Sequence, residues 1–464
     1  MIVNSKPNRE PWSTRWCRNR VLARLKGLEH GTLDLSDPWG ELSWRGADAK
    51  SSAVAGDRDS SAPHARIDVH DGRFYRRIFS GGDIGAAESW MAGEWTSPNV
   101  VDVVRFFIQN LSALERLDRG WASLRHWGSR WLHWRRGNSL RGSRRNISAH
   151  YDLGNTFYQT FLDPTMAYSA GLFRDSATSM EQASRAKFDR ICRKLDLQDD
   201  DHLLEIGTGW GGFAIHAAQH YGCRVTTTTI SREQYEFAVD WVRREGLEHR
   251  IDVRFQDYRE LSGQYDKLVS IEMIEAVGHD HLGQYLATCR DLLRRDGVAV
   301  LQAILMVDQR HARHLRSSDF IREYIFPGGD LPSVGSIVDH ATRFTDLRLM
   351  HYEEISEHYA ETLRRWRRAF EARTEQLESL GFDAAFRRMW VYYLAYCEAA
   401  FTERQVNSAQ LVLGARNCAS RAHERLAPIA ADLAPRQSVE LSNLATSSLL
   451  GAARERVFLG EATS

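Results

Sequence analysis

A glycine-dense turn after a short apolar run constrains the fold of this chain more than any other feature. Residues 203–212 read LLEIGTGWGG, and a helix-compatible segment follows. Glycine lets the backbone turn sharply and lets a ligand approach without a Cβ in the way. Because ligands of open α/β sheets bind at the carboxyl ends of strands, we predict a strand, a ligand-binding turn and a helix start. The G-x-G-x-G-G spacing differs from that of dinucleotide-binding turns, and the preceding Glu205 fits a small nucleoside ligand with a cationic centre.

Strand-like and helix-like segments alternate after this turn. Apolar or β-branched runs at residues 224–229, 251–255, 267–271 and 298–302 predict four further strands, with helical stretches between them. Such alternation predicts an α/β fold with a parallel sheet covered by helices on both faces. Polar residues gather just beyond successive strand ends, where the active site of such a sheet lies. Residues 330–430 have a mostly helical pattern.

Composition indicates a cytoplasmic enzyme. The 61 Lys and Arg residues balance the 61 Asp and Glu residues, so the net charge gives no reason to expect nucleic acid as a partner. The six cysteines are widely separated and form no C-x-x-C pair, which predicts reduced thiols and no metal site. No apolar run is long enough to span a bilayer, and the N-terminus lacks a signal-peptide pattern. A lipid substrate would therefore be reached from the membrane surface.

The chain divides into four predicted parts. Residues 1–115 form a small α+β N-terminal domain, and residues 147–430 form the catalytic domain. Residues 431–464 are a tail without a motif. Residues 116–146 form a basic, tryptophan-rich linker helix in which Trp127, Trp131 and Trp134 share one face. This composition fits binding to anionic lipid headgroups, and it equally fits a linker helix that packs its tryptophans against a neighbouring domain.

Several motifs in a fixed order resemble those of the S-adenosylmethionine-dependent cyclopropane-fatty-acid synthases, which include bacterial phospholipid enzymes and mycolic-acid cyclopropane synthases. The resemblance covers roughly residues 146 to 415. The resemblance implies a Rossmann-like class I methyltransferase sheet with a helical lid, S-adenosylmethionine as the cofactor, and helices near residues 389–397 that roof an acyl pocket. The motifs are HYDLGNTFY (150–158), MAYSAGLF (166–173), LLEIGTGWGG, TTISREQ (228–234), QDYRE (256–260), SIEMIEAVG (270–278), YIFPGG with LPS (324–333) and HYAETLRRW (358–366).

The resemblance also implies which residues bind the cofactor. Glu205 and the turn after it meet the methionine part, two polar residues of the second strand end meet the ribose, and the third strand end flanks adenine. Tyrosines from the N-terminal side close over the cofactor, although each could instead be a core tyrosine with a satisfied hydroxyl. The implied residues are Tyr151, Tyr168, Ser169, Glu205, Gly207, Thr208, Gly209, Thr229, Gln234, Asp257 and Tyr258.

Members of the family hold a bicarbonate ion that serves as the catalytic base. Glu275 matches the glutamate that binds this ion, Tyr359 matches the tyrosine, and Ile304 matches a main-chain amide donor. Two positions depart from the pattern, because Ala170 stands at the usual cysteine and Gln302 at the usual histidine. Alanine keeps its N–H, and glutamine can donate a hydrogen bond but cannot carry a proton charge. Bicarbonate binding is therefore left open, and Glu275 could instead act with water.

Glu272 lies a helical turn before Glu275 and is not carried over from the family. Its role stays open between a structural residue and an added charge in a modified site. Glu275 itself could be a helix-cap carboxylate, an alternative that the S-x-x-M-x-E-x-V-G pattern disfavours. His279 and His281 are expected on the surface rather than in a metal site, since no tight His/Asp cluster accompanies them.

The predicted reaction is transfer of a methylene or methyl group from S-adenosylmethionine to the cis double bond of an unsaturated fatty acyl chain. The expected substrates are phospholipids, the expected product is a cyclopropane, and the expected location is the inner face of the membrane. Alternatives are a methylene- or methyl-branched acyl chain, a lipid-binding protein without activity, and a small-molecule methyltransferase. The sequence leaves a homodimer open.

Overall fold

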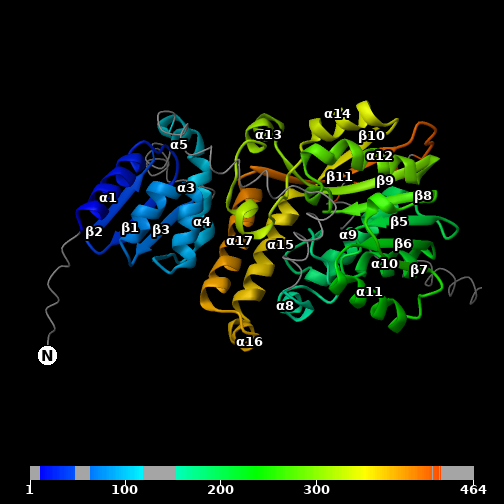
Figure 1. Cartoon of the computed structure of the whole chain (residues 1–464), viewed down its shortest axis with the longest axis horizontal. Helices are drawn as coiled ribbons and strands as arrows, with labels where there is room; N and C mark the ends of the chain where they lie inside the picture. Colours follow the sequence, from blue (N-terminus) through cyan, green and yellow to red (C-terminus); the bar gives the residue numbers. More distant parts are fainter. Residues whose placement is uncertain (1–10, 47–62, 119–152, 421, 428, 430–464) are drawn as a thin grey trace, which may run out of the picture.

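The computed structural model describes residues 11–46, 63–118, 153–420, 422–427 and 429. The predicted linker helix, apart from its first residues, lies outside the described residues, and so do Tyr151 and the predicted tail. The described chain forms two sheets, one of four strands near the N-terminus and one of seven strands. Figure 1 shows the N-terminal sheet at one end of the molecule and the larger sheet at the other.

The N-terminal domain packs helices against a small sheet of order β2-β1-β3-β4. Leu33 and Leu35 on β1, with Ile67 on β3, alternate with polar residues and are almost fully buried, so one face of the sheet points into the domain core. The strands are β1 (Thr32–Asp37), β2 (Gly40–Arg45), β3 (His64–Val69) and β4 (Trp95–Thr96), and the helices are α1 (Trp12–Leu25), α3 (Arg73–Met91), α4 (Val100–Gln109) and α5 (Leu111–Asp118).

The seven-stranded sheet has the order β10-β11-β9-β8-β5-β6-β7. The strands β5 to β9 are parallel and match the five predicted strands. Two further strands, β10 and β11, run antiparallel at one edge, inside the region whose pattern is mostly helical. The strands are β5 (His202–Ile206), β6 (Arg224–Thr229), β7 (Ile251–Phe255), β8 (Tyr265–Ile271), β9 (Leu293–Met306), β10 (Arg348–Glu354) and β11 (Val406–Gly414).

Helices cover this sheet and extend from it toward the N-terminal domain. Their amphipathic faces and caps define them; Ser231, for example, caps α11 by accepting from the Gln234 N–H, as its sequence position predicts. The helices are α8 (Asn155–Gln159), α9 (Met180–Leu195), α10 (Gly212–Tyr221), α11 (Arg232–Arg244), α12 (Leu282–Leu292), α13 (Asp308–His314), α14 (Val334–Phe344), α15 (Ser356–Glu371), α16 (Thr374–Ser379) and α17 (Ala384–Thr402). Single-turn segments are η1 (Tyr258–Glu260), η2 (Ile274–Ala276), η3 (His279–His281), η4 (Ile321–Ile325) and η5 (Ala422–Arg425).

The helix α17 joins the two halves of the molecule. It stands with α15 between the N-terminal domain and the larger sheet (Figure 1), and it contacts both α3 and α4. The Trp90 indole donates to the Arg388 carbonyl over 2.9 Å, and Arg105 forms an ion pair with Glu403 at 2.6 Å. Gln109 donates to the same carboxylate at 3.0 Å. The N-terminal domain is therefore anchored directly on a helix of the catalytic part.

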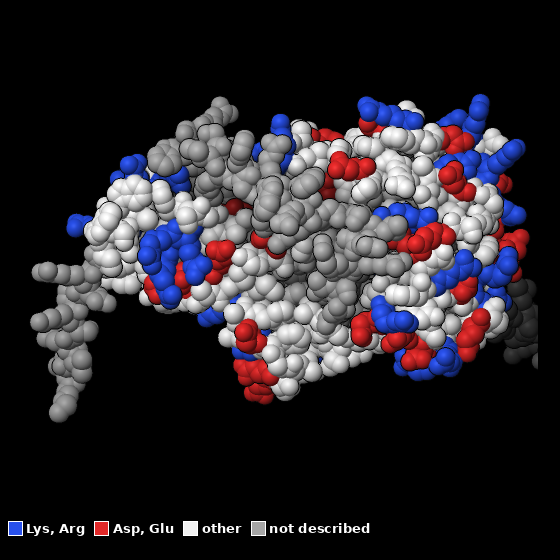
Figure 2. Space-filling view, in the orientation of Figure 1, with Lys and Arg blue, Asp and Glu red and all other residues white. Residues whose placement is uncertain are grey.

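The outer surface mixes charges of both signs. Figure 2 shows basic and acidic side chains interspersed over the end of the molecule that carries the seven-stranded sheet. Within the described ranges, no helix combines the length and apolar character that a bilayer crossing requires. The dense apolar segment at residues 389–397 belongs to α17, which also carries Arg387, Arg388 and Glu398.

Candidate active site

The glycine turn leaves open space beside the end of β5. Gly207, Gly209 and Gly211 adopt left-handed backbone conformations with φ of 102°, 53° and 98°. The N–H groups of Gly207 and Thr208 both donate to the Thr228 carbonyl at 3.0 Å, which fixes the turn against β6. A Cβ built on Gly209 would meet no protein atom within 4 Å. The turn therefore needs glycine for its conformation and leaves room for a ligand.

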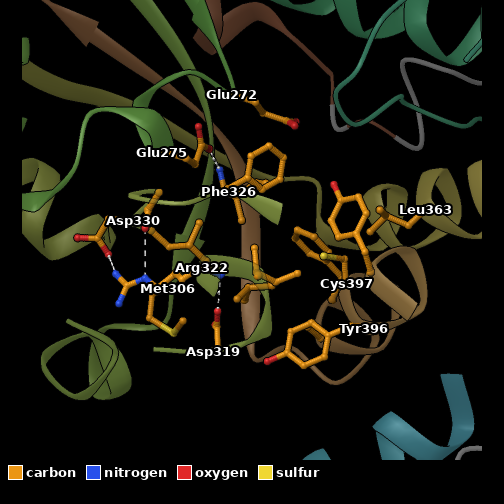
Figure 3. A pocket seen from close by; sticks show the side chains of 18 of the residues that line it. Glu272, Glu275, Met306, Asp319, Arg322, Phe326, Asp330, Leu363, Tyr396 and Cys397 are labelled. Atoms are coloured by element: carbon orange, nitrogen blue, oxygen red, sulfur yellow. Dashed lines mark hydrogen bonds and ion pairs between the residues drawn. The ribbon is translucent and has the colours of Figure 1, made fainter. Parts of the chain in front are cut away.

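A large cavity begins at this turn and extends into the N-terminal domain. Its volume is about 1580 Å³, which exceeds the 300–1,000 Å³ typical of small-molecule sites. One end is lined by the strand ends of the larger sheet, and the other end by Leu33, Leu35 and Ile67 of the N-terminal sheet. Figure 3 shows the side chains of some of the residues that line it. The cavity is wide enough for a cofactor and an apolar chain together.

The predicted cofactor residues gather at the sheet end of this cavity. All of them that the structure describes line it, from Tyr168 and Ser169 on one side to Asp257 and Tyr258 on the other. Thr229 donates to the Gln234 side chain at 2.9 Å, so the two residues predicted near the ribose lie together. Asp257 forms an ion pair with Arg259 at 2.8 Å, a partner that the sequence prediction missed. The pair is buried on the Asp257 side and fixes that carboxylate at the cavity wall.

Glu205 lies beneath the turn and is almost fully buried. It accepts a hydrogen bond of 2.6 Å from the Thr227 hydroxyl, which also contacts the Thr208 hydroxyl. Burial raises the pKa of Glu205 to about 8, while Thr227 and Lys187 act in the opposite direction. A cationic ligand beside this carboxylate would favour its ionised form.

Lys187 is a buried cation that the sequence prediction also missed. It comes from α9 and its ammonium group donates to the Ser169 hydroxyl at 2.5 Å. Burial lowers the pKa of Lys187 to about 8, and the charges of Glu272, Asp163 and Glu205 oppose this shift. Lys187 lines the cavity between two carboxylates, Glu205 and Glu272. A lysine within a helical sequence pattern does not indicate that it will be buried at the cavity, because its position depends on how α9 packs on the sheet.

Glu272 follows the end of β8 and accepts three hydrogen bonds on its carboxylate. The Ala170 N–H and the Gln302 side-chain amide donate to Oε1 at 3.0 and 2.8 Å. The Tyr359 hydroxyl donates to Oε2 at 2.6 Å. The donors come from a loop, from β9 and from α15, so three distant parts of the chain converge on one side chain. Glu272 lines the cavity, whereas Gln302 and Ala170 lie buried behind it.

Glu275 lies in η2 beside Glu272, and Figure 3 shows the two carboxylates at one end of the cavity. The Ile304 N–H donates to its Oε1, as the resemblance implies, but its Oε2 has no hydrogen-bond partner. Burial, followed by the charge of Glu272, raises the pKa of Glu275 to about 8. Burial therefore favours the protonated form of Glu275, unlike that of a carboxylate held by several donors.

The predicted bicarbonate ion does not fit this arrangement. Three of the groups predicted around the ion, namely Ala170, Gln302 and Tyr359, already donate to the Glu272 carboxylate. The other two, Glu275 and the Ile304 N–H, bind each other. The five predicted residues are thus brought together, but a side chain of the protein occupies the position between them.

Aromatic residues of α15 and α17 form another part of the cavity wall. Tyr393 of α17 shares a hydrogen bond of 2.8 Å with Tyr168, and the ring of Tyr359 stacks on Phe401 with centroids 4.5 Å apart. Tyr396 and Cys397 also line the cavity. Residues 389–397 therefore include part of the cavity wall, while Trp390 is core. Aromatic faces stabilise positive charge that develops near them.

The segment YIFPGG closes the cavity next to Glu275. Arg322 is buried, forms an ion pair with Asp330 and donates to the Ser317 carbonyl at 2.6 Å. The Asp330 N–H donates to the Glu275 carbonyl at 2.8 Å. Figure 3 shows Phe326 pointing toward the cavity beside Glu275. This motif is therefore a fixed part of the active-site wall.

The parallel strands, the glycine turn and the polar residues at successive strand ends define a class I S-adenosylmethionine-dependent methyltransferase. The open space at Gly209, the carboxylate of Glu205 and the paired Thr229 and Gln234 fit that cofactor. The family described as mycolic acid cyclopropane synthetase matches residues 138–411, and the chain belongs to this family.

The chain is similar both to a protein named as a methyltransferase and to proteins named as cyclopropane synthases. It is 39% identical over 378 residues to the tuberculostearic acid methyltransferase of Mycobacterium tuberculosis, covering 78% of this chain and 85% of that protein. It is 33% identical to the cyclopropane-fatty-acyl-phospholipid synthase of Escherichia coli, covering 76% of this chain and 88% of that protein. A solved mycolic acid cyclopropane synthase complexed with SAH and CTAB is 29% identical, with a TM-score of 0.55, and covers 58% and 98% of the two chains. The resemblance to this family is confirmed.

Proposed function

We propose that this protein transfers a methyl group from S-adenosylmethionine to the cis double bond of an unsaturated fatty acyl chain. The proposed substrates are membrane phospholipids, reached by peripheral association with the membrane surface. The observation that carries the proposal is the single cavity that joins the cofactor turn to an apolar interior in the N-terminal domain. A small soluble substrate would not need this apolar extension.

The residues of the chain explain how a poor nucleophile could react. When bound, S-adenosylmethionine supplies an electrophilic methyl group. Tyr359, Tyr393 and Phe401 line the cavity, where their rings would shield a bound alkene from water and present π faces to it. Addition of the methyl carbon to the alkene leaves a carbocation on the acyl chain, which these faces and a neighbouring carboxylate stabilise. Loss of a proton then completes the reaction.

Two products can form from this carbocation, depending on whether a hydride shift precedes the loss of the proton. Proton loss from the added methyl with closure onto the cationic carbon gives the cyclopropane that the sequence predicts. A hydride shift from the methylated carbon to the cationic carbon, followed by loss of a methyl proton, gives an acyl chain with a methylene (=CH2) branch. Two observations favour the methylene-branched chain. A relative at 39% identity is named a methyltransferase rather than a cyclopropane synthase, and the residues predicted around the base depart from the family at Ala170 and Gln302.

The test uses the full chain, S-adenosylmethionine and vesicles of a phospholipid with cis-monounsaturated chains. We expect a mass gain equal to CH2 in the acyl chain, shared by the ring and the methylene products. Proton NMR of the lipid separates the two, because only the methylene product carries vinylidene protons. Cofactor binding by titration calorimetry without any lipid product would overturn the proposed function.

A further inference from the structure

We propose that the Glu272 carboxylate is the catalytic base of this enzyme and acts in place of the bicarbonate ion. The inference rests on the proposed function, since it assigns the group that removes the final proton. The residues that the resemblance places around the ion are present. Their hydrogen bonds, however, converge on a side chain of the protein itself.

A relay of amides fixes Gln302 as a donor toward Glu272. Lys194, an almost fully buried cation, donates to the side-chain amide oxygen of Gln410 at 2.7 Å. The side-chain amide nitrogen of Gln410 then donates to the side-chain amide oxygen of Gln302 at 3.0 Å. The Gln302 nitrogen is left to donate to Glu272 at 2.8 Å. Because an ammonium group can only donate, it sets the direction of the whole chain of bonds. The departure from histidine to glutamine at position 302 thus supplies a donor of fixed orientation.

The backbone of Glu272 is held in an unfavourable conformation. Its φ is 51°, in the left-handed region, which is unfavourable for a residue with a side chain. The Glu272 N–H donates to the Gln302 carbonyl at 2.7 Å, so the main chain is fixed to β9 as well. Strain of this kind persists where the surrounding contacts over-determine it, and it concentrates at functional sites. A glycine would adopt this φ freely but would leave the three donors without an acceptor.

The two neighbouring carboxylates have different surroundings. Burial raises the pKa of Glu272, while its three donors and the nearby Lys187 ammonium act in the opposite direction. Glu275 has one donor, and burial raises its pKa to about 8. Glu272 accepts three hydrogen bonds and Glu275 accepts one, so of the two carboxylates Glu272 is the better stabilised in its ionised form. Lys187 from α9, Tyr359 from α15, Glu205 from β5 and Glu275 from η2 are the titratable groups around Glu272.

The step that we assign to Glu272 is balanced. The π electrons of the acyl double bond form a bond to the methyl carbon, the carbon–sulfur bond breaks, and the sulfur keeps that electron pair. The carbocation that results is a strong acid. A Glu272 carboxylate oxygen takes a proton from the transferred methyl group. For the ring product, the released C–H electron pair bonds the methyl carbon to the cationic carbon. For the methylene product, a hydride first moves from the methylated carbon to the cationic carbon, and the released C–H pair then forms the C=C bond. The proton leaves Glu272 for solvent between turnovers, and no oxidant or reductant is needed.

The first measurement leaves the protein unaltered. We expect turnover of the wild-type chain on unsaturated phospholipid vesicles to be the same in carbon-dioxide-free buffer and in buffer with added bicarbonate. A side-chain base needs no dissolved ion, whereas an ion-dependent enzyme loses activity on depletion. Turnover that requires bicarbonate would overturn the inference while leaving the proposed function intact. No lipid product under either condition would overturn the proposed function, and the inference with it.

The second measurement removes the base. We expect Glu272→Gln to lower turnover by about 10²–10⁴-fold, the usual contribution of a general base, with S-adenosylmethionine affinity unchanged. Glu272→Gly removes the carboxylate and frees space between the three donors, so added formate or bicarbonate should restore part of the activity in a saturable way. Rescue by a small anion is a result that a structural role for Glu272 would not produce.

The control for these variants is Glu357→Gln, because the Glu357 side chain is 84% exposed and lies outside the cavity lining. It should keep wild-type activity. Activity of Glu272→Gln above about a tenth of wild type would contradict the inference, since that loss is smaller than base removal causes. If the Glu272 variants do not fold, as judged by thermal melting, the bicarbonate-depletion experiment on the wild type decides the question.

Discussion

The two ends of the cofactor region are built in different ways. The turn between β5 and α10 is made of main chain, and glycines give it both its conformation and its open space. The reaction centre is made of side chains from separate elements, with Glu272, Gln302 and Tyr359 meeting from β8, β9 and α15. A site of the first kind tolerates few substitutions. A site of the second kind can change its chemistry by single replacements, and here two positions, Ala170 and Gln302, depart from the pattern of the family.

This contrast predicts the largest effect at the glycine turn. Gly209→Val should abolish S-adenosylmethionine binding in titration calorimetry, because the new side chain would project into the cavity from a left-handed backbone. Gly246→Val is the matched control. Gly246 also has positive φ and no neighbour within 4 Å, but it does not line the cavity. Equal loss of binding in both variants would show that backbone strain, not cofactor space, is responsible.

A smaller effect is expected where a side chain supports the reaction centre. Tyr359→Phe removes one donor to Glu272, and a hydrogen bond to a charged group contributes about 1.5–3 kcal/mol, which corresponds to roughly 10–100-fold in turnover. Losing a donor to the ionised form also raises the pKa of Glu272, so the acidic limb of the pH–rate profile should move to higher pH. Tyr352→Phe on β10 serves as the control. An unshifted limb would separate Tyr359 from the titrating group.

The difference between the two carboxylates can be measured as pH-dependent stability. The pKa of Glu275 is raised to about 8 in the folded protein, so its protonated form contributes to the free energy of unfolding. This contribution is complete below the pKa of an ordinary glutamate and is lost as pH rises through about 8. Glu275→Gln lacks this titration. Its stability relative to wild type, from chemical denaturation, should therefore rise between pH 5 and pH 9 by an amount on the order of 4 kcal/mol. A constant difference would show that Glu275 is not protonated in the folded state.

The smallest effect is expected at the contact between the two halves of the molecule. Arg105→Ala removes a partly exposed ion pair with Glu403, which is typically worth about 0.2–1 kcal/mol. Thermal melting should change slightly and cofactor affinity not at all, while KM for vesicles should rise if α17 positions the acyl chain. The exposed pair of Arg404 and Glu357 provides the comparison. An altered cofactor affinity would mean that the two ends of the cavity are coupled.

The sequence predicts the cofactor end well because the features involved are local. The five parallel strands follow from apolar runs, and every predicted cofactor residue that the structure describes lines one cavity. The strands β10 and β11 were not predicted, because β11 mixes Asn407, Ser408 and Gln410 with apolar residues. Its pairing with β9 comes from tertiary contacts.

The reaction centre was predicted as a set of residues but not as an arrangement. The pattern around Glu275 singled out a segment that lines the cavity, yet it left the role of Glu272 open. The positive φ of Glu272 and the convergence of three donors depend on the register of β8 against β9 and on the position of α15. Lys187 was missed for the same reason, since its burial depends on how α9 packs. Long-range packing of this kind leaves no periodic signal in a sequence.

The reach of the cavity into the N-terminal domain bears on which carbon receives the methyl group. An alkyl tail that fills the space would stop against Leu33, Leu35 and Ile67. The distance from this end of the cavity to Glu272 would then determine how many carbons lie between the tip of the tail and the reacting bond. The small domain would serve as a molecular ruler, and a bulkier side chain at its far wall would shift the branch point along the hydrocarbon.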